Sequence, residues 1–321
     1  MRVLFITLTN IGDVVLSTTL LDRVLATHPD AVVDVVAGAR AVELFKGMPN
    51  LGKLIPVIKK KRHGHYIDLW RELKGTNYDI IIDLRTPLLT KFLKGKKKIT
   101  FRGSKKGHMS QQFADLWPQE ETRTLQQRLW LEDETHNKVI VETAAFPGKL
   151  ISVAPTANWI GKCWPQREFA ETLRRISELD GMKGVTFAIF GAPHERAMVA
   201  DLIDYLPKNQ VVDLVGKTSL QQAFAWFKQS DLFLGNDSGL AHMAAAADIP
   251  MVTLFGPTSP ERYAPLTAKG VTLVAPESEE VNLEPTVAKR LITSIKPDLV
   301  IETVVQVLER NAPQQQEKKH A

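Results

Sequence analysis

Residues 231–263, DLFLGNDSGLAHMAAAADIPMVTLFGPTSPERY, constrain the fold of this chain more than any other stretch. They hold two short apolar runs, at 232–234 and 251–255, separated by a polar glycine loop and an alanine-rich run. This order predicts a strand, a loop, a helix and a second strand, the unit from which parallel α/β sheets are built. In such a sheet a ligand binds outside the carboxyl ends of the strands.

The loop of this unit carries the first candidate binding residues. Asp237, Ser238 and Gly239 lie where the helix is expected to begin, and backbone N–H groups at a helix N-terminus are free to bind an anion. His242 follows about one helical turn later. A simple helix cap by Asp or Ser is the alternative interpretation. A second loop of Gly, Pro and Thr at 256–258 favours a binding site.

The N-terminal part of the chain shows the same alternation. Apolar runs at 2–7, 32–36 and 53–58 predict strands, and helical periodicity at 14–26 predicts a helix after the first of them. This order predicts a doubly wound parallel sheet. Asp13 lies in the loop after the first strand, where a carboxylate can take a proton from a hydroxyl nucleophile. Alternatively, Asp13 only stabilises the helix dipole.

The second half of the chain predicts a further sheet of this kind, with strands at 150–154, 185–190 and 210–214 before the unit at 231–263. A length of 321 residues is consistent with two domains, and two doubly wound domains that face each other enclose a cleft.

We expect a first domain over 1–146 and a second over 147–296, with the linker somewhere in 133–147. Two final segments follow, a helix within 297–311 and a polar, disordered tail at 312–321. Less regular patterns predict helices at 115–131 and 284–293, and a strand at 99–102.

Composition limits the class of protein. The single cysteine, Cys163, excludes an internal disulfide and a thiolate-rich metal site, and it fits a reducing compartment. No stretch reaches the roughly 18 to 20 apolar residues that span a bilayer. We therefore expect a cytoplasmic protein, free or peripheral on a membrane.

Residues 53–106 carry 16 Lys and Arg against 4 Asp and Glu, a local charge of +12. Such a surplus indicates an anionic partner, although a solvated lysine-rich surface is the simpler interpretation. No aromatic residues alternate with the basic runs as a nucleic-acid stacking platform requires, so we expect no nucleic acid. A phosphorylated, carboxylate-rich glycolipid fits better, and the basic loops would also hold the protein on an anionic membrane.

Three motifs carry a resemblance to a known family. GNDSGLAHMAAAADIPMVTLFGPTSPERYAP resembles the donor-site signature of glycosyltransferase family 9, the ADP-heptose:lipopolysaccharide heptosyltransferases. ITLTNIGDVVLSTTLL and GKCWPQREFAETL resemble two other elements of that family, in the same order along the chain. The resemblance implies the GT-B architecture, two Rossmann-like domains that face each other across a cleft. It also implies that the C-terminal helix returns to the first domain.

The resemblance further implies a role for individual residues. Asp13 corresponds to the proposed catalytic base, and Lys162 to a lysine that contacts the donor phosphates. The predicted donor-binding residues are Thr156, Lys162, Glu195, Leu220, Asp237, Ser238, Gly239, Leu240 and His242. We expect the acceptor to be bound by basic side chains of the first domain, namely Lys59, Lys60, Lys61, Arg62, Arg85 and Arg102.

The implied reaction moves heptose from ADP-L-glycero-β-D-manno-heptose to the inner core of lipopolysaccharide, at a Kdo or heptose residue, with inversion. The implied location is the cytoplasmic face of the inner membrane. The chain contains no DxD motif, so we expect neither a metal ion nor a cofactor. Charge on the departing diphosphate would instead be offset by Lys162 and by the helix N-terminus at 237–239.

Other functions are compatible with parts of this pattern. The same fold can serve a non-catalytic sugar-nucleotide binding protein, or a family member that uses a different nucleotide sugar. A Rossmann dehydrogenase is disfavoured because the loop at 9–13 lacks G-x-G-x-x-G.

Overall fold

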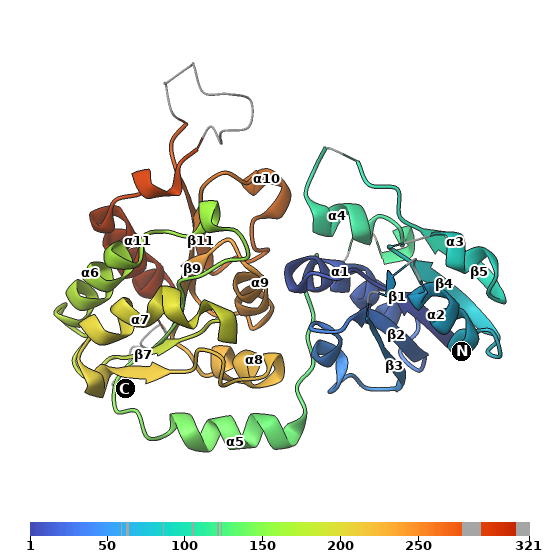
Figure 1. The fold of residues 1–321 in the computed structure, drawn as a ribbon, viewed down its shortest axis with the longest axis horizontal. Coiled ribbons are helices and arrows are strands. Elements are labelled where there is room, and N and C mark those ends of the chain that lie inside the picture. Colours follow the sequence, from blue (N-terminus) through green and yellow to red (C-terminus); the bar gives the residue numbers. More distant parts are fainter. Residues whose placement is uncertain are drawn as a thin grey trace, which may run out of the picture.

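The structure is a computed structural model of the chain. It describes all residues except Lys59, Arg62, His63, Thr86, Lys105, Glu121, Arg123, 278–289 and 313–321. Two parallel sheets, each flanked by helices, lie side by side and are joined by a helical connection (Figure 1). We call the part around the first sheet the N-terminal lobe and the part around the second sheet the C-terminal lobe.

The N-terminal lobe is built on five parallel strands in the order β3-β2-β1-β4-β5. The strands are β1 (Arg2–Ile6), β2 (Val32–Gly38), β3 (Leu51–Val57), β4 (Tyr78–Asp83) and β5 (Gly95–Thr100). The helices are α1 (Ile11–Thr27), α2 (His65–Leu73), α3 (Pro87–Lys91) and α4 (Met109–Ala114). Because the strand order reverses between β1 and β4, the loops that follow these two strands border a crevice.

The C-terminal lobe is built on six strands in the order β11-β10-β9-β6-β7-β8. The strands are β6 (Leu150–Ala154), β7 (Thr186–Ile189), β8 (Val211–Asp213), β9 (Leu232–Asn236), β10 (Met251–Phe255) and β11 (Gly270–Val274). The helices are α6 (Gln166–Ser177), α7 (Arg196–Tyr205), α8 (Leu220–Lys228), α9 (Gly239–Ala246), α10 (Pro260–Tyr263) and α11 (Pro297–Arg310). Here the order reverses between β6 and β9, so the predicted lysine and glycine loops border one crevice.

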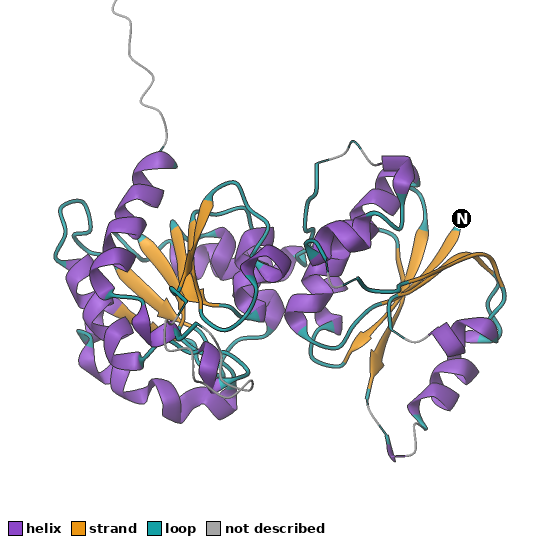
Figure 2. Cartoon of the chain, turned by 90° about the horizontal axis from the view of Figure 1, so that it is seen from above, coloured by secondary structure: helices purple, strands orange, loops and turns teal. Residues whose placement is uncertain are grey.

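Burial explains the strand sequences. Every residue of β6, β9 and β10 is buried, as expected for parallel strands covered by helices on both faces (Figure 2). One apolar core runs from the α1 side of the first sheet into α8 and α9 of the second lobe. The lobes therefore share buried surface where α1 meets α9.

The predicted helix at 115–131 is wrong. Helix α4 ends at Ala114, and Pro118 begins only a single 3-10 turn. Proline cannot continue a helix because it lacks the N–H and clashes with the preceding turn. Trp117 instead donates a 2.8 Å hydrogen bond from its indole to Thr27 Oγ1. The expected linker region contains a helix, α5 (Asp133–Thr143), which lies along the edge of the C-terminal lobe beside α8 (Figure 1).

Three further predictions differ from the structure. The strand expected at 99–102 begins at Gly95, so three lysines lie within the edge strand β5, where charged side chains protect an open edge. Helix α11 does not return to the N-terminal lobe. Its apolar stripe of Val300, Val304 and Val307 is buried in the core of the C-terminal lobe, because α6, β10 and β11 offer an apolar surface nearby. Of the helix expected at 284–293, residues 284–289 lie outside the described residues and Ile292–Ser294 form a 3-10 turn.

Candidate functional site

The N-terminus of α1 lies directly against the N-terminus of α9, across the boundary between the lobes. A Cβ added at Gly12 would lie 2.9 Å from Cδ2 of His242, and one added at Gly239 would lie 2.8 Å from Cβ of Ile11. Glycine at both positions thus permits this close approach. The approach brings the loop after β1, with Asp13, next to the loop after β9.

Asp13 occupies the first turn of α1 and is half-buried. Asn10, the residue before the helix, donates a 3.0 Å hydrogen bond from Nδ2 to Oδ2 of Asp13. This contact orients the carboxylate at the edge of the sheet. Its position fits the predicted role of a base for a hydroxyl group that enters between the lobes.

Lys162 and Asp237 form an ion pair in the crevice between β6 and β9. Lys162 Nζ donates to Asp237 Oδ2 over 2.7 Å, and Thr258 Oγ1 donates to the same oxygen over 2.6 Å. The Lys162 side chain is 20% exposed and that of Asp237 is 6% exposed, so the lysine is the partner open to solvent. Lys162 offsets the negative charge of Asp237. This explains how a carboxylate can lie at a helix N-terminus that is expected to bind phosphate.

The lysine loop is held in place by Trp164, whose side chain is fully buried. Its backbone N–H donates to Oδ1 of Asn236 over 3.1 Å, and its indole donates to the carbonyl of Ile295 over 3.0 Å. The first bond ties the loop after β6 to the end of β9. Lys162 is therefore positioned by a rigid neighbour two residues later in the chain.

Three polar atoms of the β9–α9 region are buried and lack a hydrogen-bond partner among the described residues: Asn236 Nδ2, Ser238 Oγ and His242 Nδ1. Buried polar atoms are normally paired, so such a group indicates a site that a ligand completes. Burial lowers the pKa of His242 to about 4, although Asp237 acts in the opposite direction. The imidazole is therefore neutral near pH 7, with one ring nitrogen as a hydrogen-bond donor and the other as an acceptor.

Thr156 and Glu195 come together at the ends of β6 and β7. Thr156 Oγ1 donates to Glu195 Oε2 over 2.8 Å, and the backbone N–H of Ala192 donates to the same oxygen over 2.7 Å. The carboxylate thus fixes the turn at 193–195 that precedes α7. This places both predicted donor residues at one edge of the C-terminal sheet, next to the lysine loop.

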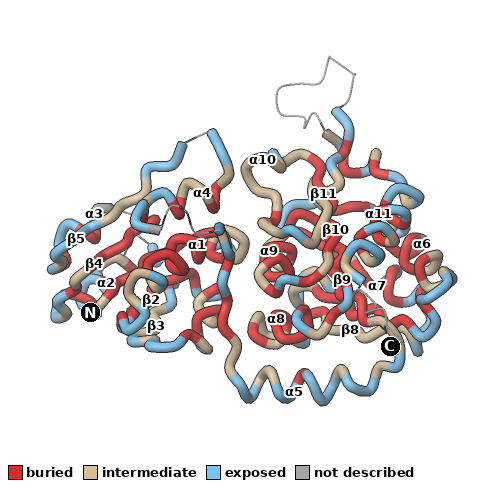
Figure 3. The backbone as a smooth tube through the Cα atoms, turned by 180° about the vertical axis from the view of Figure 1, so that it is seen from behind, coloured by how far each residue is buried: buried red, intermediate tan, exposed pale blue. Residues whose placement is uncertain are grey.

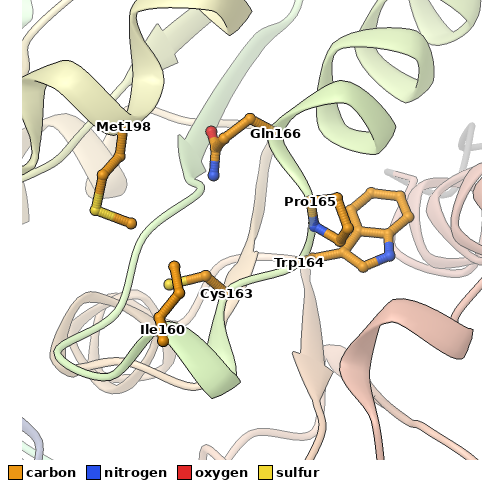
Figure 4. A pocket seen from close by; sticks show the side chains of 6 residues that line it. All are labelled: Ile160, Cys163, Trp164, Pro165, Gln166 and Met198. Atoms are coloured by element: carbon orange, nitrogen blue, oxygen red, sulfur yellow. The ribbon is translucent and has the colours of Figure 1, made fainter.

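A cavity of about 280 Å³ lies on the α7 side of the lysine loop. It is lined by Ile160, Cys163, Trp164, Pro165, Gln166 and Met198 (Figure 4). Burial raises the pKa of the Cys163 thiol, so this cysteine is not a reactive thiolate. The cavity is mainly apolar and contains none of the predicted donor residues, whereas the polar crevice between β6 and β9 contains most of them.

The two predicted leucines differ in their surroundings. Leu240 lies in the first turn of α9 beside Gly239, and is half-buried. Leu220 begins α8, and its backbone N–H donates to Oε1 of Glu43 in the N-terminal lobe over 2.9 Å. The amide of Leu220 is therefore already used in a contact between the lobes.

The predicted basic residues are spread along the N-terminal sheet. Arg85 follows β4, the neighbour of β1, so it lies at the same crevice as Asp13, and its Nη1 is buried without a hydrogen-bond partner among the described residues. Lys60 and Lys61 follow β3, two strands away from β1, and Lys60 pairs with Asp68 over 2.7 Å. Arg102 is exposed after β5. Lys59 and Arg62 lie outside the described residues.

Sequence reasoning missed several contributors to the site. Asn236 and Thr258 lie in the two polar loops that mark the motif, so their position after a strand was an available signal. His108 gave no such signal. Its Nε2 lies 2.8 Å from the carbonyl oxygen of Ala264, 156 residues away, and its charge lowers the pKa of His242.

Within the described residues, no group of three or more His, Cys, Asp or Glu side chains is arranged to hold a metal ion. In that same part of the chain, no helix is both long enough and apolar enough to cross a membrane.

Two doubly wound parallel sheets, each with a reversal of strand order at its centre, form the GT-B architecture that solved heptosyltransferase structures share. The sequence profile of glycosyltransferase family 9 (heptosyltransferase) matches residues 117–290. The chain therefore belongs to glycosyltransferase family 9 and is a transferase enzyme.

Individual relatives agree with this assignment. Lipooligosaccharide heptosyltransferase 2 of Haemophilus influenzae is 26% identical, over 88% of this chain and 91% of the relative. The structure of ADP-heptose lipopolysaccharide heptosyltransferase II of Escherichia coli superposes with a TM-score of 0.78 at 22% identity, over 97% of this chain and 99% of that one. The E. coli heptosyltransferase WaaC with ADP has a TM-score of 0.73 at 18% identity, over 96% and 100% of the two chains.

Proposed function

We propose that this enzyme transfers heptose from ADP-L-glycero-β-D-manno-heptose to the inner core of lipopolysaccharide, with inversion and without a metal ion. The acceptor sugar is Kdo or heptose. The observation that carries the proposal is the contact between Gly12 and His242, which sets Asp13 beside the anion-binding loop of the second lobe. The names of the relatives, and the ADP bound by one of them, support the choice of donor and acceptor.

The donor occupies the crevice between β6 and β9. Lys162 and the backbone N–H groups of Ser238 and Gly239 bind the diphosphate, because they supply a mobile charge and a helix N-terminus. The N–H of Asp237 is not available, since it donates to the carbonyl of Leu254 over 3.1 Å. The unpaired polar atoms of Asn236, Ser238 and His242 complete the hydrogen bonds to donor oxygens.

Asp13 acts as the base. It takes the proton of the acceptor hydroxyl while that oxygen bonds to the anomeric carbon, and the bond from this carbon to the phosphate oxygen breaks. Attack from the side opposite the departing ADP inverts the anomeric centre. Lys162 and the α9 N-terminus stabilise the negative charge that develops on the diphosphate, a role that a divalent metal has in other glycosyltransferases.

Each lobe binds one of the two substrates. Residues 1–146 bind the acceptor and residues 147–296 bind the donor. Arg85 lies at the crevice of Asp13 and is the best placed of the basic residues for the acceptor's phosphate or carboxylate groups. Lys60, Lys61 and Arg102 extend the positive surface along the sheet, with Lys59 and Arg62 outside the described residues. The enzyme works at the cytoplasmic face of the inner membrane, where a lipid-anchored acceptor is available.

The test is transfer from ADP-heptose to a Kdo-bearing lipid A acceptor in the presence of EDTA, for the wild type and for Asp13→Asn. We expect wild-type turnover in EDTA, and a loss of about 10²-fold or more in the variant. ADP affinity, measured by calorimetry, should be the same in both proteins. Equal turnover of the two proteins would exclude Asp13 as the base. A folded wild type that binds ADP without transferring heptose would point to another nucleotide sugar or to a longer core acceptor.

A further inference from the structure

Helices α2 and α3 each have one buried and one exposed apolar face. Leu69 and Leu73 of α2, with Leu89 and Leu93 at α3, are buried against the first sheet. On the opposite faces, Ile67 and Trp70 are 55% and 36% exposed. Leu88 and Phe92 are 62% and 67% exposed. We call Ile67, Trp70, Leu88 and Phe92 the outer patch.

The outer patch forms one surface because both helices cover the same face of the sheet. Their buried leucines belong to a single small core with residues of β1 and β4. Both helices lie at the outer end of the N-terminal lobe, away from the C-terminal lobe (Figures 1 and 3). Large apolar side chains gathered on an exposed surface indicate an interaction site.

Basic side chains accompany the outer patch. Arg71 lies in α2 and Lys74 directly after it. Lys91 is the last residue of α3, and Lys94 lies three residues further on. All four side chains are exposed. Lys74 Nζ lies 4.5 Å from the centre of the Trp70 ring. The combination of tryptophan, aliphatic side chains and lysines is typical of segments that lie in the interface of an anionic bilayer.

The acidic residues of α2 do not cancel this charge. Asp68 pairs with Lys60 over 2.7 Å and lies 3.9 Å from Arg71, and Glu72 pairs with Lys53 over 2.8 Å. The shorter contact of each carboxylate is thus to a lysine outside the helix. The surface keeps its positive charge, which is complementary to a layer of anionic lipid headgroups.

We propose that the outer patch docks the enzyme on an anionic lipid bilayer, with its four apolar side chains inserted among the headgroups. The inference rests on the proposed function, because a lipid-anchored acceptor is presented by a membrane. The loops after β3 and β4 connect the carboxyl edge of the sheet, where Asp13 and Arg85 lie, directly to α2 and α3. Docking through these helices therefore brings the acceptor-binding edge close to the bilayer.

The test is co-sedimentation of the full chain with vesicles of phosphatidylethanolamine and phosphatidylglycerol, compared with vesicles of phosphatidylcholine alone. We expect binding to the anionic vesicles that is at least about 10-fold stronger than to the neutral ones. The variant Trp70→Ser/Phe92→Ser should lose about 10-fold or more of this binding. A second variant, Lys74→Glu/Lys91→Glu, should lose binding and also its dependence on salt concentration.

The matched control is Val141→Ser/Tyr205→Ser, which removes two exposed apolar side chains of α5 and α7. It should bind the anionic vesicles like the wild type. Circular dichroism should show that all variants keep the wild-type fold, since Leu69, Leu73, Leu89 and Leu93, which are buried against the sheet, are unchanged. The inference is overturned if the Trp70/Phe92 variant binds like the wild type. It is also overturned if the wild type forms a lipid-independent dimer that this variant abolishes, because the surface would then be a protein interface.

A second readout separates this inference from the proposed function. Heptose transfer to a water-soluble acceptor without lipid should be unchanged in the outer-patch variants, whereas transfer to an acceptor embedded in anionic vesicles should fall. Absence of transfer by the wild type in both assays would contradict the proposed function. The co-sedimentation result would still decide the role of the outer patch.

Discussion

Lys162 Nζ and Asp237 Oδ2 lie 2.7 Å apart, so the lysine expected to bind phosphate is paired with a carboxylate of the neighbouring loop. To bind Lys162, the donor diphosphate must compete with the Asp237 carboxylate, and the diphosphate carries the larger negative charge. Thr258 also donates to Asp237 Oδ2, so the carboxylate keeps a partner when the lysine moves. The ion pair therefore holds the lysine in the crevice.

Removal of this lysine should weaken nucleotide binding. We expect Lys162→Ala to raise the Kd for ADP about 10- to 100-fold, since the diphosphate loses a mobile cation in the crevice. Calorimetric titration with ADP measures the effect. Lys183→Ala, an exposed lysine of the same lobe, is the control and should bind like the wild type. An unchanged Kd for Lys162→Ala would show that the diphosphate binds elsewhere.

The contact between the lobes should be sensitive to one methyl group. Gly12→Ala places a Cβ 2.9 Å from Cδ2 of His242, which is too close, so either α1 or α9 must move. We expect a loss of about 1–3 kcal/mol in the free energy of unfolding, and a larger fractional loss of turnover. Urea denaturation and the transfer assay measure the two effects. Gly75→Ala is the matched control, because its Cβ would meet no atom within 4 Å. Equal stability and turnover of both variants would contradict the tight contact.

The buried imidazole of His242 should make the fold sensitive to acid. Its pKa is lowered to about 4 in the folded state, below its ordinary value of 6.5, because burial disfavours the charged form. The unfolded chain therefore binds more protons between these values, and stability falls as the pH decreases through this window. The loss from His242 between pH 8 and pH 5 is about 2 kcal/mol.

Urea denaturation at both pH values measures this loss. His242→Gln removes the titrating group, so the variant should show a smaller difference in unfolding free energy between pH 8 and pH 5. A difference as large as that of the wild type would mean that other groups carry the acid sensitivity.

Gln221 should couple the lobes near the linker helix. Its Nε2 donates to the carbonyls of Glu43 and Trp130 over 2.8 and 2.9 Å, and its Oε1 accepts from the N–H of Glu132 over 3.2 Å. All three partners precede the C-terminal lobe. We expect Gln221→Leu to cost about 1–3 kcal/mol of unfolding free energy, because buried backbone groups lose their partner.

Denaturation in urea is the measurement for this substitution as well. Gln306→Leu is its control, since Gln306 is exposed on α11 and its side chain donates to Glu302 of the same helix. It should leave stability unchanged within about 0.5 kcal/mol. If both variants were equally stable, the lobes would have to be held together by α1 and α9 instead.

Much of the fold could be read from local patterns. Continuous apolar runs predicted the strands at 2–7, 150–154 and 251–255 within one or two residues, because parallel strands covered on both faces have no polar face to show. The loops with Asp13 and Asp237 were found because special residues gather where such strands end. The 3.6-residue period likewise predicted a helix over 297–310, which is the extent of α11.

Other features depend on contacts that no local pattern records. The chain after Ala114 takes an irregular path. Trp117 and Trp130 are each buried in the core separately, and they do not form one apolar face of a helix. The edge strand β5 carries three lysines, so its apolar signal is weak, and pairing with β4 decides its extent.

By itself, the sequence determined two α/β sheets, the loops that end their central strands and the residue types placed there, since periodicity and turn chemistry are local properties. Only the tertiary structure decided which of those residues meet. It paired Lys162 with Asp237 over 75 positions, joined Glu43 to Leu220 between the lobes, and packed α11 onto its own lobe. These contacts form between helices and strands that lie far apart in the sequence. They depend on the shapes of the packed surfaces and on which side chains become buried there.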